Sequence, residues 1–412
     1  MTRHADVVIV GAGVVGLSIA YELSTRTDLS VAIFDKSGPG SGTSGRSAGV
    51  ICRHDHGPIY QRLSLMGLTR MKHFASEYGF EFNPWGAVGV VREPDAYPRN
   101  NPYSAELKDA PSGQYVDIPL GREELLERFP WIEPTGVLGG VFEPNTGFIN
   151  PFELIELYRR LIGGSSRVTL DYGNPVLELR REGDRVTTVA TRRGLWTAGT
   201  VINASGAWSG KVSGLAGTSI HITPQRMNVV AVLPVDEAMP NAPLHGARGL
   251  SWEGDGVWCR GETGGTLLFG QHRDKTDPTR ETADPDFFNS RADEGFVGAV
   301  RANIEQYYRL PANRVLNGWT CVYDTSDDGF PILGYDERVE NLIHAVGMNG
   351  HGMTIHAGIA QCVTQLLTTG SSALDISQFM PWPETLDFSI LAPGRFAAGK
   401  PLPLFGKSGG HG

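Results

Sequence analysis

The sequence predicts a mixed fold, α/β plus α+β, in which a Rossmann-type domain is interleaved with a second domain built on a mostly antiparallel β-sheet. A β-branched run at 6–10 leads into a glycine-rich turn and a helix, the order expected of a parallel strand and its crossover. A strand, a glycine-rich turn and a helix follow one another again at 342–367, and several strand-like segments lie within 176–268. Because 412 residues exceed what one hydrophobic core usually supports, we expect two domains.

The composition is that of an ordinary globular protein and argues against several classes of partner. Hydrophobic residues make up 40% of the chain, charged residues 20%, and the net charge is -9. No basic cluster interleaved with aromatic residues is present, so we expect no nucleic-acid partner. The most apolar stretch, 7–20, is too short for a membrane span and is interrupted by glycines. The four cysteines are scattered, and we expect a reduced, cytoplasmic protein with no membrane partner.

The first strand runs directly into a dinucleotide fingerprint. The segment GAGVVG matches G-x-G-x-x-G, with glycines at Gly11, Gly13 and Gly16. Gly11 suits the tight turn and Gly13 lets the backbone approach a pyrophosphate. Gly16 lets the following helix, from 14 to about 24, pack closely on the strand. The N-terminal N–H groups of that helix would face phosphate oxygens.

The second strand supplies an acidic residue at the expected offset. It spans 30–34 and ends at Asp35, close to the position from which a carboxylate meets a ribose hydroxyl. The fingerprint alone leaves NAD and FAD open. The long glycine- and serine-rich strip at 38–49 suits wrapping a bound, non-exchanging cofactor, and it favours FAD.

The same strip contains a motif of a different enzyme class. Gly45-Arg46-Ser47-Ala48-Gly49 formally matches the G-x-S-x-G nucleophile elbow of α/β-hydrolases. That elbow needs a strand before the serine and a helix after it, whereas here a loop precedes the serine and a strand-like segment follows at 50–52. A hydrolase is therefore a minor alternative, and it predicts a protein without flavin.

The middle of the chain alternates helical and strand-like patterns. Apolar spacing predicts a helix over 59–78, and Asn150 followed by Pro151 predicts a helix start that continues to about 161. Strands are predicted at 176–179, 185–189 and 200–203, and a segment of small residues follows at 204–209. The sheet of the second domain is expected within 221–268.

The C-terminal third carries two further features of a flavin site. Cys321 lies in the segment GWTCVY and is a candidate covalent anchor, although a lone cysteine is otherwise a small buried hydrophobe. A strand at 342–346 enters the turn GMNGHG, and a helix is predicted from 353 to about 367. N–H groups and a helix dipole aimed at a flavin would favour its reduction. An ordinary glycine turn is the alternative.

These patterns suggest a discontinuous domain division. We assign 1–85, 145–220 and 325–386 to the FAD-binding domain and 86–144 and 221–324 to the substrate domain. The remainder, 387–412, is a C-terminal tail rich in Pro and Gly, which we expect to be partly disordered.

Taken together, these segments resemble the D-amino-acid-oxidase-type FAD-dependent oxidoreductases, in particular the branch of monomeric sarcosine, N-methyltryptophan and pipecolate oxidases. The resemblance covers most of the chain in the right order, with 97–140 loosely constrained. The matching segments are Asp35 in place of a more common glutamate, Ile51-Cys52-Arg53-His54, 203–209, Cys321-Val322-Tyr323, Gly350-His351-Gly352 and 375–379.

The resemblance implies roles for individual residues. Cys321 corresponds to the cysteine that forms a thioether with the flavin ring methyl, which implies covalent FAD. Arg53 corresponds to the arginine that grips the substrate carboxylate, a task suited to its planar fork. His272, Tyr323 and His351 complete the expected catalytic and substrate-pocket residues. The expected cofactor-binding residues are Gly11, Gly13, Gly16, Asp35, Lys36, Ser44, Arg46, Ser47, Val176, Gly206, Trp208, Cys321, Gly347, Asn349, Gly350, His351, Gly352, Met353 and Thr354.

Two positions depart from that branch. Its oxidases place a lysine that activates oxygen where this chain has Leu268. A second lysine, which helps to hold the carboxylate, corresponds to Thr354. These departures weigh against rapid use of oxygen and against a pocket identical to that of sarcosine oxidase.

The expected reaction is the oxidation of a secondary amine or N-substituted amino acid, with hydride passing from the carbon next to nitrogen to flavin N5. The imine hydrolyses, and oxygen reoxidises the flavin with formation of peroxide. The alternatives are an amine dehydrogenase or biosynthetic tailoring flavoenzyme with another electron acceptor, and a non-catalytic flavoprotein subunit. The two histidines of His54-Asp55-His56 lack a third ligand pattern, so no metal is expected.

Overall fold

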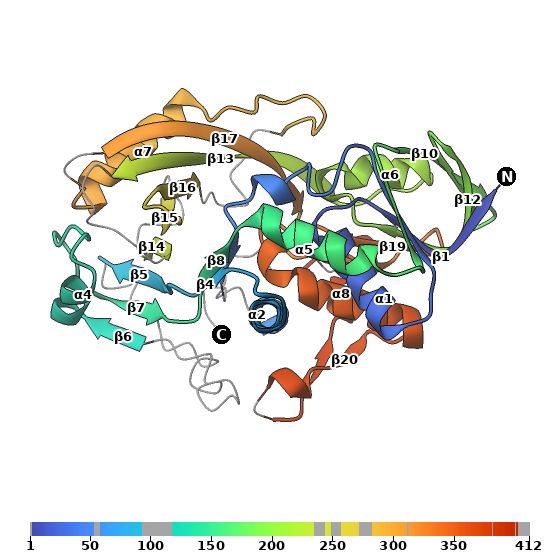
Figure 1. Cartoon of the computed structure of the whole chain (residues 1–412), viewed down its shortest axis with the longest axis horizontal. Coiled ribbons are helices and arrows are strands. Elements are labelled where there is room, and N and C mark those ends of the chain that lie inside the picture. The colour runs from blue at the N-terminus through green and yellow to red at the C-terminus, as the bar shows by residue number, and fades with distance from the viewer. Residues whose placement is uncertain are drawn as a thin grey trace.

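The computed structural model describes residues 2–52, 58–92, 118–234, 244–248, 257–271, 282–310, 313–380, 382–399 and 401–402. Figure 1 shows two β-sheet regions arranged along the long axis of the molecule, with the N-terminal strand at one end.

The first sheet has eight strands in the order β10-β11-β12-β1-β2-β9, with β19 beside β12 and β18 beside β19. The pairs β1–β12, β1–β2, β2–β9 and β12–β19 are parallel, while β10–β11, β11–β12 and β18–β19 are antiparallel. The strands are β1 (Arg3–Val10), β2 (Val31–Asp35), β9 (Val168–Tyr172), β10 (Val176–Glu182), β11 (Arg185–Thr191), β12 (Gly194–Asn203), β18 (Ile332–Tyr335) and β19 (Leu342–Val346).

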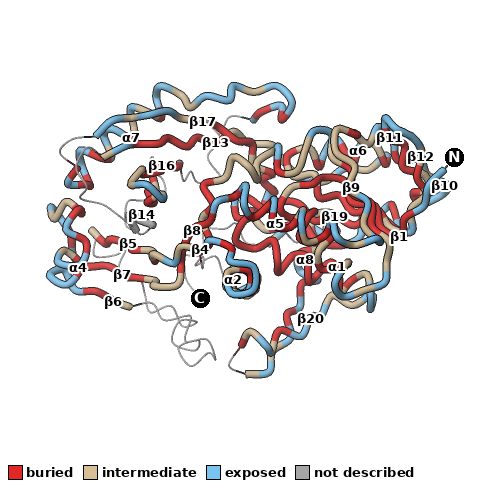
Figure 2. The backbone as a smooth tube through the Cα atoms, in the orientation of Figure 1, coloured by how far each residue is buried: buried red, intermediate tan, exposed pale blue. Residues whose placement is uncertain are grey.

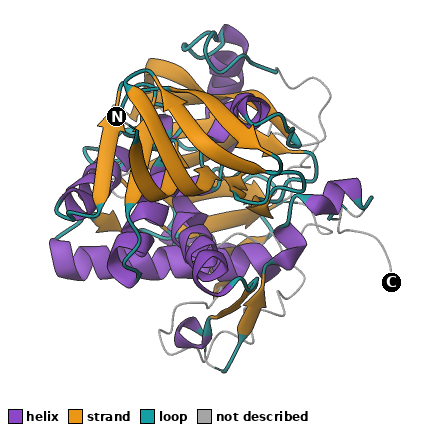
Figure 3. Ribbon diagram, turned by 90° about the vertical axis from the view of Figure 1, so that its right-hand side faces the viewer, coloured by secondary structure: helices purple, strands orange, loops and turns teal. Residues whose placement is uncertain are grey.

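Alternate residues of β1 enter two separate cores, because successive side chains of a strand point to opposite faces. Val7 and Ile9 pack with the helices, whereas Val8 and Val10 pack on the opposite face. Figure 3 shows the long helices gathered on one side of the strands. The helices of the first core are α1 (Val14–Arg26), α2 (Pro58–Tyr78), α5 (Pro151–Gly163) and α8 (Gly352–Thr369), and α6 (Ser209–Leu215) lies on the opposite face.

The second sheet also has eight strands, in the order β17-β13-β16-β15-β14-β5-β7-β6. Its pairs are antiparallel except β14–β5. A separate core joins one face of it to α4 (Arg122–Arg128) and α7 (Glu294–Tyr307). The strands are β5 (Ala87–Val91), β6 (Ile118–Gly121), β7 (Gly139–Glu143), β13 (Ile222–Pro234), β14 (Leu244–Arg248), β15 (Val257–Gly261), β16 (Leu267–Gln271) and β17 (Asn313–Ser326).

Shorter elements complete the described part of the fold. Strands β3, β8 and β4 form a three-stranded sheet in the order β3-β8-β4, whose strands β4 and β8 lie between the two sheet regions in Figure 1, and β20 pairs with β21. These elements are β3 (Val50–Ile51), β4 (Phe82–Asn83), β8 (Gly147–Ile149), β20 (Ala373–Asp375) and β21 (Thr385–Asp387), the short helix α9 (Gly394–Ala397), and the 3-10 turns η1 (Ser44–Arg46), η3 (Gly206–Trp208), η4 (Ser377–Phe379) and η5 (Ser389–Leu391).

The predicted fold class is confirmed, and the predicted elements lie close to their observed bounds. The Asn150 side chain accepts a hydrogen bond from the Phe152 N–H at 3.0 Å, which is the cap that the sequence predicts for α5. The glycine Gly370, with φ +71°, ends α8. Figure 2 shows the buried backbone concentrated in β1, β19 and the helices beside them.

Two local segments can be compared with their expectations. In the expected C-terminal tail, Arg395 is buried and its guanidinium pairs with both carboxylate oxygens of Asp328 at 2.7 and 2.9 Å, whereas residues 403–412 lie outside the described residues. As expected, the G-x-S-x-G segment lacks the geometry of a nucleophile elbow, since the short turn η1 precedes Ser47 and the strand β3 follows it. Within the described residues, no helix is long and apolar enough to cross a membrane.

Candidate functional site

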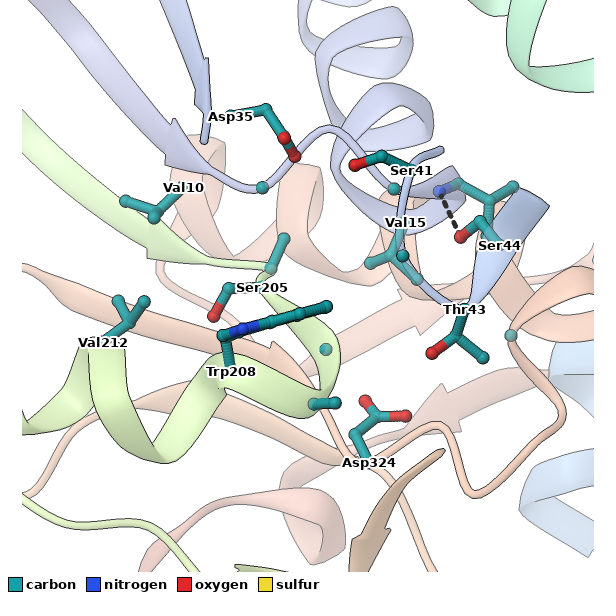
Figure 4. Close-up of a pocket in the computed structure, with 18 of the residues that line it drawn as sticks. Val10, Val15, Asp35, Ser41, Thr43, Ser44, Ser205, Trp208, Val212 and Asp324 are labelled. Atoms are coloured by element: carbon teal, nitrogen blue, oxygen red, sulfur yellow. Dashed lines mark hydrogen bonds between the residues drawn. The ribbon is translucent and has the colours of Figure 1, made fainter. Parts of the chain in front are cut away.

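A pocket of about 410 Å³ lies at the carboxyl ends of β1 and β2, the edge at which open α/β sheets bind ligands. Figure 4 shows side chains from four distant parts of the sequence around it. Predicted cofactor-binding residues that line it are Gly11, Gly13, Asp35, Lys36, Ser44, Ser47, Val176, Gly206, Trp208, Gly350, Gly352 and Met353, and the predicted substrate residue Tyr323 lines it too.

The constraints on the first and third glycines of the fingerprint are visible as close contacts. A Cβ atom on Gly11, which has φ +111°, would stand 2.5 Å from the carbonyl oxygen of Ala204. A Cβ atom on Gly16 would stand 2.0 Å from the carbonyl oxygen of Gly11. Larger residues at either position would therefore push β1 away from β12 or α1 away from the turn.

The start of α1 faces the serine-rich strip. The Val14 N–H donates to Ser44 Oγ at 3.0 Å, and a Cβ on Gly13 would stand 3.2 Å from the same oxygen. The Ser44 hydroxyl hydrogen is left to donate elsewhere, and both residues line the pocket. A helix N-terminus with a hydroxyl group beside it is suited to bind phosphate oxygens.

Asp35 is fixed by the backbone on both sides. Its Oδ2 accepts from the Ala12 N–H at 2.9 Å and its Oδ1 from the Ser37 N–H at 2.8 Å. The carboxylate therefore stands in one orientation at the pocket edge (Figure 4). This is the geometry required of an acceptor for ribose hydroxyls.

An ion-pair cluster, formed by Lys36, Trp208, Lys211 and Asp286, borders the same end of the pocket. The Asp286 carboxylate accepts from Trp208 Nε1 at 2.8 Å, from Lys211 Nζ at 2.6 Å and from Lys36 Nζ. Lys36 Nζ also lies 4.1 Å from the centre of the Trp208 ring. Burial alone would raise the pKa of Asp286, but these three donors outweigh it and lower the pKa. Asp286 and Lys211 were not predicted from the sequence, since no motif marks the segment before α7 or the helix α6.

A third residue that was not predicted, Asp324, lies in the pocket wall (Figure 4). Its Oδ2 accepts from the N–H groups of Gly347 and Met348 at 2.8 and 3.1 Å, and its carbonyl oxygen accepts from the Asn349 N–H at 3.3 Å. Burial raises the pKa of this carboxyl to about 6, against the lowering effect of its backbone donors. Its position directly after the C-x-Y motif is the signal that could have identified it.

The turn that Asp324 holds needs left-handed backbone at three positions. Gly347 and Gly350 have φ +74° and +85°, and Asn349 has φ 52°. A Cβ on Gly350 would stand 2.4 Å from Cε2 of Tyr323, so the tyrosine ring lies directly over the glycine. Asn349 is buried and its Oδ1 accepts from the Ser326 N–H at 3.0 Å. The glycine turn therefore does two things: it starts α8, and its backbone conformation allows the close contact with β17.

Cys321 is buried in β17 beside the strip but is not among the residues that line the pocket. Trp319 Nε1 donates to the carbonyl oxygen of Arg46 at 2.9 Å, and Thr43 Oγ1 donates to the carbonyl oxygen of Val322. These contacts hold the backbone around Cys321 against residues 43–46. Burial raises the pKa of the Cys321 thiol to about 12, with Arg46 lowering it slightly, so the thiol is protonated at neutral pH.

Other predicted residues support the pocket from outside its lining. Thr354 Oγ1 donates to the Val50 carbonyl oxygen at 3.1 Å and accepts from the Cys52 N–H at 3.4 Å, which joins α8 to β3. His351 is buried at the start of α8, with its ring 5.2 Å from that of Tyr60. Gly16, Arg46, Cys321, Gly347, Asn349, His351 and Thr354 are the predicted cofactor residues that do not line the pocket.

Two predicted substrate residues, Arg53 and His272, lie outside the described residues, as does the 54–56 motif. Within the described part, no group of three or more His, Cys, Asp or Glu side chains could hold a metal ion. Leu268 packs in a small apolar cluster with Ala48, Val229 and Ala231, which places this side chain beside the strip.

The residues present fit a flavin adenine dinucleotide. Glycine backbone, the first turn of α1 and the Ser44 hydroxyl suit the pyrophosphate, and Asp35 suits the ribose. The N–H groups of Gly352 and Met353 open α8, where the helix itself supplies no acceptor, and both residues line the pocket.

Comparisons with known proteins agree with this geometry. The family profile described as FAD dependent oxidoreductase (DAO) matches residues 6–366. The monomeric sarcosine oxidase of Bacillus sp. strain NS-129 is 25% identical over 394 residues, covering 92% of this chain and 97% of that protein. The 4-methylaminobutanoate oxidase (formaldehyde-forming) of Paenarthrobacter nicotinovorans is 25% identical over 92% of this chain and 46% of its own length.

Solved structures share the fold. The L-proline dehydrogenase from P. horikoshii has a TM-score of 0.82 at 21% identity, covering 97% of this chain and 100% of that one. The glycine oxidase from Bacillus cereus ATCC 14579 has a TM-score of 0.72 at 20% identity, covering 89% and 96%. Since the family profile spans most of the sequence and the pocket residues fit the cofactor, the chain belongs to the DAO family of FAD-dependent oxidoreductases.

Proposed function

We propose that this protein oxidises a secondary amine or N-substituted amino acid to an imine, which water then hydrolyses. The proposal is carried by one observation: the fingerprint, Asp35 and the turn before α8 all line the same pocket. Relatives named monomeric sarcosine oxidase and 4-methylaminobutanoate oxidase support an N-substituted substrate. Bound FAD would supply the chemistry by accepting hydride from the carbon next to nitrogen.

The protein's own contribution is to bind and orient. Ser44 and the start of α1 would hold the pyrophosphate, and Asp35 would hold the ribose. The first turn of α8, through Gly352 and Met353, would direct N–H groups and the positive end of its dipole at the flavin ring. Such donors favour the negative charge that reduction places on the ring.

The face of the second sheet beside the strip would lie against the substrate. Alternation along β13 directs Val229 and Ala231 to this face with Leu268, while Val230 and Val232 enter the opposite core. Trp258 packs against the same cluster. An apolar wall excludes water from the reacting carbon, and Arg53, by resemblance, would position a substrate carboxylate.

The function is tested by incubating the purified flavoprotein with a panel of N-methyl amino acids, cyclic secondary amines and primary amines. The proposal predicts that secondary amines are consumed and that carbonyl products form in equal amounts. Primary amines are the matched control. A flavoprotein that leaves every amine unchanged would be the non-catalytic subunit, and a colourless protein that hydrolyses esters would contradict the proposal outright.

A dehydrogenase with another electron acceptor is the second candidate, and Leu268 favours it. Leu268 packs with Ala48 and Val229, so position 268 itself holds no cation, whereas the related oxidases carry a lysine at this position by resemblance. A buried arginine, Arg260, lies opposite Leu268 in the sheet and donates to the Ala48 carbonyl oxygen at 2.6 Å. Comparing peroxide formed per amine oxidised in air with the rate supported by an artificial dye separates the two. If one peroxide forms per amine oxidised, and amine is oxidised in air as fast as with the dye, the protein is an oxidase. If peroxide forms slowly while the dye is reduced fast, the protein is a dehydrogenase.

We further propose that Cys321 tethers the flavin. Its support is the position of β17, whose residues on both sides of Cys321 bind residues 43–46 of the strip. Denaturing the holoprotein in acid should leave yellow colour on the wild-type polypeptide and release it from Cys321→Ala. Cys362→Ala, at another buried free cysteine, is the control and should keep the colour. Release of free FAD from wild type would contradict the tether and leave the reaction assignment intact.

A further inference from the structure

Asp324 has a place in the pocket that neither the fingerprint nor the tether explains. It is buried, lines the pocket, and binds the turn that precedes α8 through three backbone N–H groups. Its side chain accepts the hydrogen bonds from Gly347 and Met348 at the same oxygen, Oδ2. A buried carboxylate beside an apolar-lined pocket is costly, and two neutral N–H donors compensate its charge only in part.

The charged and titratable groups around Asp324 come from three elements. Tyr60 of α2 is buried, donates to the Gly329 carbonyl oxygen at 3.0 Å, and has a raised pKa from its burial and from the negative charges of Asp324 and Asp328. Asp328 is neutralised by its pairing with Arg395. The His351 ring lies against Tyr60 from the start of α8. Within the part of the chain that the structure describes, no basic residue is among the groups that shift the pKa of Asp324.

We propose that Asp324 is a positioning residue that couples flavin reduction to proton uptake. It holds the 347–350 turn against the pocket, and its carboxyl group takes up a proton from water when the cofactor is reduced. The inference rests on the proposed function, because it requires FAD in this pocket with its ring toward Gly350, Gly352 and Met353. A new negative charge in a buried site raises the pKa of a neighbouring carboxyl group.

Two electrons and one proton reach the cofactor from the hydride donor, which leaves one added negative charge in the pocket. One proton from solvent forms an O–H bond on the Asp324 carboxylate and cancels that charge. The neutral carboxyl group can still accept from Gly347 and Met348, so the turn keeps its place.

The test is a redox titration of the holoprotein with reference dyes at several pH values above the pKa of about 6 that Asp324 has without cofactor. The slope of potential against pH counts the protons taken up. Wild type should take up about one more proton per flavin than Asp324→Asn. Ser326→Ala is the matched control, because Ser326 holds the same turn through Asn349 without contributing a charge, and its slope should equal that of wild type.

Equal slopes for wild type and Asp324→Asn would overturn the inference. If the asparagine variant does not fold, the wild-type slope decides alone: uptake of only the proton that belongs to the hydride would contradict the inference. Protein that binds no FAD would instead contradict the proposed function, so the two failures are distinguishable by the flavin absorbance recorded before titration.

Discussion

Two buried titratable residues, His356 and Asp324, lie in different parts of this molecule. His356 lies in the helix core, where its Nδ1 bonds the Met353 carbonyl oxygen at 2.8 Å and its Nε2 bonds Tyr158 Oη at 2.9 Å. Asp324 lies in the pocket wall with a raised pKa. The two groups have opposite effects on stability in acid, because acid charges the buried histidine and neutralises the buried carboxylate.

Acid should destabilise the fold through His356. Burial lowers its pKa from 6.5 to about 3, so the unfolded chain binds this proton more strongly than the folded chain. The stability contribution is complete above pH 6.5 and is lost as pH falls toward 3. His356→Gln keeps a donor and an acceptor without titrating. Urea unfolding at pH 7 and pH 5 should show a smaller loss for the variant, and an identical loss would show that His356 does not carry the effect.

At the scale of elements, the sequence predicted those features that depend on interactions within a few residues. The β-branched run of β1, the Asn150 cap of α5 and the glycine turn before α8 each act within a few residues, and each is observed. The close packing of α2 on α8 is different. A Cβ on Gly67 would stand 1.7 Å from the Thr354 carbonyl oxygen, and this contact joins residues far apart in the sequence. No periodicity in α2 distinguishes Gly67 from a tolerated helix glycine.

Gly67→Ala should therefore destabilise the protein, because the added methyl group meets backbone atoms that cannot move independently. We expect a loss of roughly 1–3 kcal/mol. Gly298→Ala is the matched control: Gly298 is a helix glycine of α7 with open space around it, and alanine should stabilise by up to about 1 kcal/mol. The free energy of unfolding of both variants is the measurement. A neutral Gly67→Ala would mean that α2 and α8 can separate freely.

The whole molecule is organised by contacts between segments that the sequence separates. Asp324 binds the turn at 347–349, residues 43–46 bind β17, and Asp286 binds Trp208. The order of motifs could predict a flavin fold and part of the pocket lining, because the fingerprint and the glycine turn have fixed local geometry. It could not predict Asp286, since an isolated aspartate in an irregular segment carries no local signal of its distant contacts.

The ion-pair cluster at the pocket edge should retain the cofactor. Asp286 joins Lys36 and Lys211 across the pocket end that Asp35 marks, so its loss should speed FAD release. In a Cys321→Ala background, Asp286→Asn should release FAD about two to five times faster at low salt, an effect expected of partly exposed ion pairs and reduced by added salt. Asp184→Asn removes an exposed partner of Arg181 and serves as control. Unchanged release would exclude a role in retention.

We infer that this pocket binds FAD and that a secondary amine reduces the bound flavin. The test is to mix the purified protein anaerobically with an N-methyl amino acid and to record the absorbance. A flavin spectrum is expected before mixing, with bleaching in proportion to the amine added. A protein without flavin, or a flavin that no secondary amine bleaches, would contradict it.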